Sequence, residues 1–312
     1  MTTLKKQVKI SGVGIHSGAP VNVTINPTKE RGIFFQRVDM VGTDKIPATY
    51  DNVGDTKMRN TTVGSLDCAH VKTVEHLMAG LFMSGVDSAI VEIDGPETPI
   101  LDGSAQEFIK AFDAVGVTGG VMRRIVVKRD VVVRANEALR SLPLLVRLKI
   151  KLFNLLSGRR ADGYVRLSPN SGVSLDVVAT LVYKEKIIGT QSYSYSYDET
   201  PEAKCDFVEN VARARTFGKY SEWEYLKKNG MGRGASEENV IALNDVGDGT
   251  LNETLWPDEF VRHKIVDAVG DMFTSGGMVC GRLESYKGSH ALNNLVLKKL
   301  FSNPANYDII GV

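Results

Sequence analysis

Apolar and polar positions along the first third of the chain alternate in short stretches separated by turn residues. Strict alternation places one face of a strand in a core, so this pattern predicts β-strands. The predicted strands are residues 6–15, 19–27, 32–38 and 86–95. Two stretches have helical spacing instead, at 73–85 and 104–116, where Thr73 and Ser104 are candidate N-caps. Residues 118–121, TGGV, are predicted to be a linker.

The same order, strands first and helices after, recurs in the rest of the chain. Predicted strands are residues 123–134, 172–183 and 191–198, and predicted helices are 203–217, 221–230 and 258–276. Residues 281–301 follow as strand, turn and helix. Strands grouped before helices are typical of α+β layers. The sequence therefore predicts an α+β protein with two similar layered domains, 1–121 and 122–312, each a β-sheet packed with helices.

Residues 138–160 differ from the rest because they are rich in leucine and in basic side chains. Leucines fall on one helical face and basic residues on another, which predicts a helix opened by Pro143. The stretch VRLKIKL within this segment also alternates as a strand would. A basic amphipathic helix can lie on an anionic membrane surface. The alternative is an ordinary helix that packs one face on the core and exposes the other.

Composition narrows the class of protein without naming a function. The 312 residues are 43% hydrophobic and 24% charged, as in soluble globular proteins. The formal net charge of +1 argues against a nucleic-acid partner. Three widely spaced cysteines without a CxxC pair fit a reducing compartment, and no stretch resembles a signal peptide or a membrane span. We expect a cytoplasmic protein.

The helix predicted at 258–276 carries candidate metal ligands. His263 and Asp267 are four residues apart and share one helical face, which Asp271 continues. Together with His76, these two side chains would leave one position open on a tetrahedral zinc ion. Two histidines and a carboxylate also match the iron site of non-haem oxygenases, and a solvated surface pair is the simplest alternative.

Glu75 precedes His76 in an apolar helix and is a candidate general base, because zinc lowers the pKa of a bound water to about 7 but the water still needs a proton acceptor. A carboxylate that complements the positive end of the helix is the alternative. His290 lies at a turn before the last helix. It could act there as a cation or an acid, oriented by Asp271, or simply be a capping or surface histidine.

Several ordered motifs carry a resemblance to a known family. HExxH, GxSxG and the phosphate-binding GxxxxGK[ST] are absent. Instead the chain contains, in order, SGVGIHSG, TVEHLMAGL, PILDGSA, ARTFG, FVRHKIVDAVGD and HALNN. This set closely resembles the UDP-3-O-acyl-N-acetylglucosamine deacetylases, zinc amidases of lipid A biosynthesis in Gram-negative bacteria. The resemblance extends from about residue 5 to about residue 300.

The resemblance implies two similar α+β domains with the active site between them, and a role for each matching residue. It implies Zn²⁺, with Fe²⁺ as the alternative ion, and an acylated UDP-sugar substrate that is hydrolysed to acetate and a free amine. The implied metal ligands are His76, His263 and Asp267; the implied catalytic residues are Glu75 as general base, His290 as the opposing cation, Asp271 as its orienting partner and Thr216 at the oxyanion; the implied substrate-binding residues are Phe217, Lys264 and His16. Residues 220–243 would form the passage for the acyl chain. We expect a monomer, with transient contact to the inner membrane surface through residues 138–160.

Two positions depart from the family pattern. Ser289 replaces a glycine before the last histidine, where a side chain would crowd the loop or require another backbone angle. Gly163 stands where the family has a substrate-contacting lysine, and Arg159 or Arg160 is the candidate replacement. These departures leave two alternatives, a divergent family member with an altered acyl-sugar substrate or a non-catalytic nucleotide-sugar- or lipid-binding relative.

Overall fold

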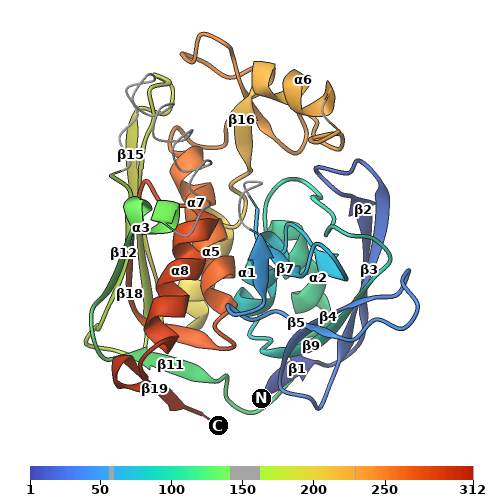
Figure 1. Ribbon diagram of the computed structural model, residues 1–312, viewed down its shortest axis with the longest axis vertical. Helices are drawn as coiled ribbons and strands as arrows, with labels where there is room; N and C mark the ends of the chain where they lie inside the picture. Colours follow the sequence, from blue (N-terminus) through green and yellow to red (C-terminus); the bar gives the residue numbers. More distant parts are fainter. Residues whose placement is uncertain (56–59, 141–161, 229, 312) are drawn as a thin grey trace.

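Two outer sheets enclose a central double layer of helices in the computed structural model, which describes residues 1–55, 60–140, 162–228 and 230–311 (Figure 1). The layer order is sheet, helices, helices, sheet, which confirms the α+β fold with two layered halves. The division after residue 121 stays a prediction. The helix predicted within 138–160 lies, from residue 141 on, outside the described residues. Within the described ranges, no helix is long and apolar enough to cross a membrane.

The first half builds its sheet from the alternating segments. The strands are β1 (Thr2–Leu4), β2 (Val8–Val13), β3 (Pro20–Pro27), β4 (Gly32–Arg37), β5 (Ile46–Pro47), β6 (Val53–Asp55), β7 (Thr62–Gly64), β8 (His70–Val71) and β9 (Ser88–Ile93). The main sheet has the order β2-β3-β9-β4-β5, with β9 antiparallel to β3 and parallel to β4. Every second residue of β3 is buried, so the alternation in the sequence corresponds to one covered face.

Helices α1 (Glu75–Met83) and α2 (Gln106–Val115) cover this sheet. Every residue of α1 is buried, including its two polar residues, Glu75 and His76. Thr73 does not cap α1: its φ is +58°, and its hydroxyl donates to Glu97 instead. Gly116, with φ +71°, ends α2 as predicted.

The second half is centred on one long strand. The strands are β10 (Val117–Gly119), β11 (Arg124–Val127), β12 (Val131–Arg134), β13 (Tyr164–Ser168), β14 (Leu175–Val182), β15 (Thr190–Tyr197), β16 (Phe217–Lys219), β17 (Ile241–Leu243), β18 (Met278–Tyr286) and β19 (Tyr307–Ile310). β18 pairs with β11 at its start, and further along it pairs with β13 on one edge and with β14 on the other. The predicted strand 123–134 is two strands, and the predicted linker 118–121 begins with β10, which pairs with β1.

The helices of the second half are α3 (Ala135–Arg140), α5 (Pro201–Asn210), α6 (Tyr220–Lys228), α7 (Glu259–Phe273), α8 (His290–Phe301) and the 3-10 turn η1 (Pro304–Asn306). The helix predicted at 203–217 is wrong in its second part, because α5 ends at Asn210. The backbone N–H of Arg215 donates to the Glu259 carboxylate, and that of Thr216 donates to the Gly103 carbonyl. These tertiary hydrogen bonds replace helical ones, and Phe217 then starts β16.

The two halves meet where α1 packs against α7. The approach is close at Gly270, since a Cβ added there would lie 1.9 Å from the carbonyl oxygen of Glu75. Only glycine permits this separation of the two backbones. The contact places the first turn of α1 opposite the buried face of α7, and the candidate site lies there.

Candidate metal centre

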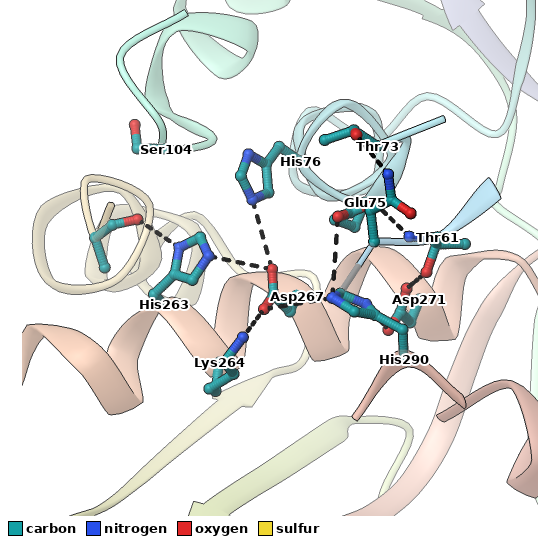
Figure 2. Close-up of polar contacts among 12 residues, drawn as sticks. Thr61, Thr73, Glu75, His76, Ser104, His263, Lys264, Asp267, Asp271 and His290 are labelled. Carbon is teal, nitrogen blue, oxygen red and sulfur yellow. Dashed lines mark hydrogen bonds and ion pairs between the residues drawn. The ribbon is translucent and has the colours of Figure 1, made fainter. Parts of the chain in front are cut away.

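Three helices deliver the candidate residues to one buried place (Figure 2). Glu75 and His76 are the first two residues of α1, and His290 is the first residue of α8. His263, Asp267 and Asp271 lie one turn apart along α7. All six side chains are buried. The structure thus brings together residues that are far apart in the sequence.

Two imidazoles and one carboxylate converge as a potential ligand set. The Nε2 atoms of His76 and His263 lie 3.5 Å and 3.4 Å from Oδ1 of Asp267. One ligand atom from each residue lies within 4.8 Å of the others. Donors of this kind and number suit Zn²⁺ or Fe²⁺. The residues present therefore fit a divalent metal ion.

The protonation of the set also favours metal binding. Burial lowers the pKa of His263 to about 3, so its imidazole is neutral. Its Nδ1 lies 3.0 Å from the Ala214 carbonyl, an acceptor that assigns the proton to Nδ1 and leaves Nε2 facing Asp267. Burial would raise the pKa of Asp267, but the Lys264 ammonium, 2.6 Å from Oδ2, holds it well below its usual range. Metal ligands need these deprotonated forms.

Glu75 and His290 face each other beside the ligand set. Oε1 of Glu75 lies 3.9 Å from Nε2 of His290, whose Nδ1 donates to Oδ2 of Asp271 at 2.8 Å. Burial disfavours the imidazolium, but Asp271 and Glu75 outweigh this and raise the pKa of His290 to about 10. Burial also raises the pKa of Glu75, although His290 and His76 oppose it. A proton acceptor and a proton donor therefore lie on the same side of the site.

The residues expected to contact substrate surround this cluster at different distances. The Phe217 ring lies 6.3 Å from that of His263, and Nζ of Lys264 lies 5.4 Å from the centre of the Phe217 ring. The backbone of Thr216 is held between Gly103 and the strand β17. His16 lies on the loop after β2, and its N–H donates to the Glu97 carboxylate, which also accepts the Thr73 hydroxyl. His16 is thus linked to the start of α1 through Glu97.

Sequence reasoning missed two residues that donate hydrogen bonds to Asp271. The Thr61 hydroxyl donates to Oδ1 of Asp271 at 2.5 Å, and Nδ2 of Asn293 donates to Oδ2 of Asp271 at 2.9 Å. Asn293 was accessible to sequence reasoning, since it lies three residues after His290 and shares its helical face. Thr61 precedes a short strand, and its local sequence carries no signal of this contact.

The two departures from the family pattern have simple structural explanations. Ser289 has an extended backbone with φ −157°, and its hydroxyl accepts the N–H of Leu292, so it caps α8 rather than crowding the loop. At Gly163, an added Cβ would lie 2.7 Å from the carbonyl oxygen of Lys287. Among the residues that the structure describes, Lys287 places a cationic side chain next to Gly163, and its Nζ donates to Asp162 at 2.8 Å. Arg159 and Arg160 lie outside the described residues.

Known proteins resemble the chain over its whole length. Residues 1–302 match the family model of UDP-3-O-acyl N-acetylglycosamine deacetylase. A UDP-3-O-acyl-N-acetylglucosamine deacetylase from Myxococcus xanthus is 37% identical over 309 residues, which are 99% of this chain and 88% of that protein. Proteins of the same name from Nitratiruptor sp. and Neisseria meningitidis serogroup C are 35% and 32% identical, over 99% and 98% of this chain and 92% and 91% of theirs. The chain belongs to the UDP-3-O-acyl N-acetylglycosamine deacetylase family.

Proposed function

We propose that this protein hydrolyses the N-acetyl group of UDP-3-O-acyl-N-acetylglucosamine to give UDP-3-O-acyl-glucosamine and acetate, the committed step of lipid A biosynthesis. The observation that carries the proposal is the buried cluster of His76, His263 and Asp267 with Glu75 beside it, in a chain of this family. A non-catalytic relative is not favoured, because the similar proteins are named deacetylases and the cluster is complete.

His76, His263 and Asp267 would hold the metal ion, which we propose is Zn²⁺, with Fe²⁺ as the alternative. When bound, such an ion supplies Lewis acidity, which polarises an amide carbonyl and lowers the pKa of a water molecule. Asp267 is held for this role on its other oxygen by Lys264. His263 is held by the Ala214 carbonyl.

Glu75 would be the general base that takes a proton from the attacking water. The Thr61 N–H donates to Oε2 of Glu75 at 3.0 Å, so Oε1 remains directed toward His290. The pKa of Glu75 is raised toward neutral pH, so that its carboxylate can both accept a proton and return it. His290, charged and oriented by Asp271, would stabilise the oxyanion. Glu75 or His290 would then protonate the leaving amine.

The substrate would extend from this cluster along both halves. We infer that Thr216 donates to the oxyanion, that Phe217 lines the sugar site, and that Lys264 and His16 contact the nucleotide-sugar. Residues 220–243 would enclose the acyl chain. A separate buried apolar cluster of Trp223, Val240 and Ala242 lies in this segment.

We further propose that the protein acts as a cytoplasmic monomer. The three cysteines are free, as expected of a reducing compartment.

Contact of residues 138–160 with an anionic membrane surface rests on the sequence alone, and failure of the protein to bind anionic vesicles would contradict it.

Acetate release by the purified protein from UDP-3-O-acyl-N-acetylglucosamine tests the proposed function, with metal content measured on the same sample. We expect release that is lost on chelation and restored by Zn²⁺.

Glu75→Ala should lower kcat by at least about a hundredfold, the usual contribution of a general base, while the bound metal is retained. Glu107→Ala, which removes an exposed carboxylate on α2, is the control and should leave the rate unchanged. An unchanged rate in Glu75→Ala would remove Glu75 from the mechanism.

A further inference from the structure

We propose that Thr61 is a positioning residue that fixes the general base and the opposing histidine relative to each other. The inference rests on the proposed function, in which Glu75 and His290 act on the same substrate. Thr61 comes from the first half of the chain, immediately before β7, and it reaches the second half at Asp271. It therefore joins the two acids across the seam between the halves (Figure 2).

Thr61 contacts each acid through a different group. Its backbone N–H donates to Oε2 of Glu75 at 3.0 Å, and its hydroxyl donates to Oδ1 of Asp271 at 2.5 Å. Both acids are buried, and Thr61 itself is 2% exposed. Hydrogen bonds to buried carboxylates are stronger than those between neutral groups, because the acceptor is charged and water does not compete.

These two bonds leave each carboxylate with one defined orientation. Oε2 of Glu75 is occupied by Thr61, so Oε1 is the oxygen that faces His290 at 3.9 Å. Oδ1 of Asp271 is occupied by Thr61, while Oδ2 accepts Nδ1 of His290 and Nδ2 of Asn293. Neither carboxylate can rotate without breaking a bond to Thr61.

A shift of one catalytic group would therefore be transmitted to the other. Glu75 lies on α1 and His290 on α8, and their direct separation is too long for a hydrogen bond. Thr61 supplies a hydrogen-bonded route, from Glu75 through its own backbone and hydroxyl to Asp271 and then to His290. Since proton transfer requires positions accurate to fractions of an ångström, loss of the hydroxyl should slow the reaction more than it weakens substrate binding.

Thr61→Val removes the hydroxyl and keeps the shape and the backbone N–H. We expect kcat for acetate release to fall on the order of tenfold to a hundredfold, with KM within about twofold of the wild-type value. Thr61→Ser, which retains a hydroxyl, should recover most of kcat. Thr62→Val is the matched control, since Thr62 is the next residue, is also 2% exposed and makes no described bond to Glu75 or Asp271.

Proton NMR of the zinc-loaded protein gives a readout that is independent of turnover. With one donor fewer on Asp271, its carboxylate should accept more strongly from Nδ1–H of His290, so that proton resonance should move downfield in Thr61→Val but not in Thr61→Ser or Thr62→Val. A wild-type kcat in Thr61→Val, or an unmoved resonance, would overturn the role of Thr61. Absence of acetate release from the wild-type protein would instead contradict the proposed function.

Discussion

His290 carries its charge because two acids lie beside it. Burial alone would favour the neutral imidazole, yet Asp271 and Glu75 raise the pKa of His290 to about 10, from an ordinary value of 6.5. The folded state therefore keeps a proton that the unfolded state releases above about pH 6.5. The stability from this proton is complete below pH 6.5 and is lost as the pH rises toward 10.

We predict that the free energy of unfolding of the chelated wild-type protein falls between pH 7 and pH 10, and that this fall is shallower in His290→Gln. Urea unfolding at a series of pH values measures both slopes. His70→Gln is the control, because the pKa of His70 is lowered by burial and this imidazole is neutral throughout the range. Parallel slopes for the wild type and His290→Gln would show that His290 does not hold this proton.

Individual residues also show which parts of the site can be predicted from the sequence and which cannot. Six candidates, Glu75, His76, His263, Asp267, Asp271 and His290, were named from spacing and from the family motifs, and the structure brings all six together. Thr61 and Glu97 were not named, because their partners are distant in sequence and neither residue lies in a periodic pattern. At Ser289, where the sequence predicts crowding or another backbone angle, the serine has an extended backbone and caps α8.

Helices α1 and α7 approach each other closely at Gly270, next to the site. We predict that Gly270→Ala lowers the free energy of unfolding by about 1–3 kcal/mol and also lowers metal affinity, because the added Cβ would lie 1.9 Å from the Glu75 carbonyl and must push α1 away. Urea unfolding and metal titration measure the two effects. Gly120→Ala, whose Cβ would meet no atom within 4 Å, should change stability by less than about 0.5 kcal/mol. Equal effects of the two substitutions would argue against a tight contact.

Elements were predictable where the local pattern alone decides the structure. The alternating runs became β2, β3, β4 and β14, and the apolar run with its acid and histidine became α1. The helix predicted at 203–217 failed at its end, because a buried carboxylate on α7, Glu259, binds the backbone of Arg215. Such a contact depends on the arrangement of α7 in space, which local periodicity does not contain.

At the scale of the whole molecule, the site is formed where the two halves of the chain pack against each other. Strand β18 forms the centre of its sheet by pairing with strands distant in the sequence, and such pairings are not visible in any local window. The layer order sheet, helices, helices, sheet then sets α1 against α7 (Figure 1). His76 comes from one half, and His263 and Asp267 come from the other. A metal ion bound to all three would therefore connect the halves.

This arrangement predicts that metal stabilises the whole fold. An ion that binds only the native state adds about 2.7 kcal/mol when its concentration is a hundredfold above Kd. We expect Zn²⁺ to raise Tm in the wild-type protein, chelation to reverse the rise, and His76→Ala to remove most of it, because His76 is the member of the described cluster that comes from the first half. His70→Ala, which changes a histidine outside the cluster, should keep the full rise. A metal-dependent rise that survives in His76→Ala would mean that the ion binds to one half alone, and that the seam between α1 and α7 is held by packing without it.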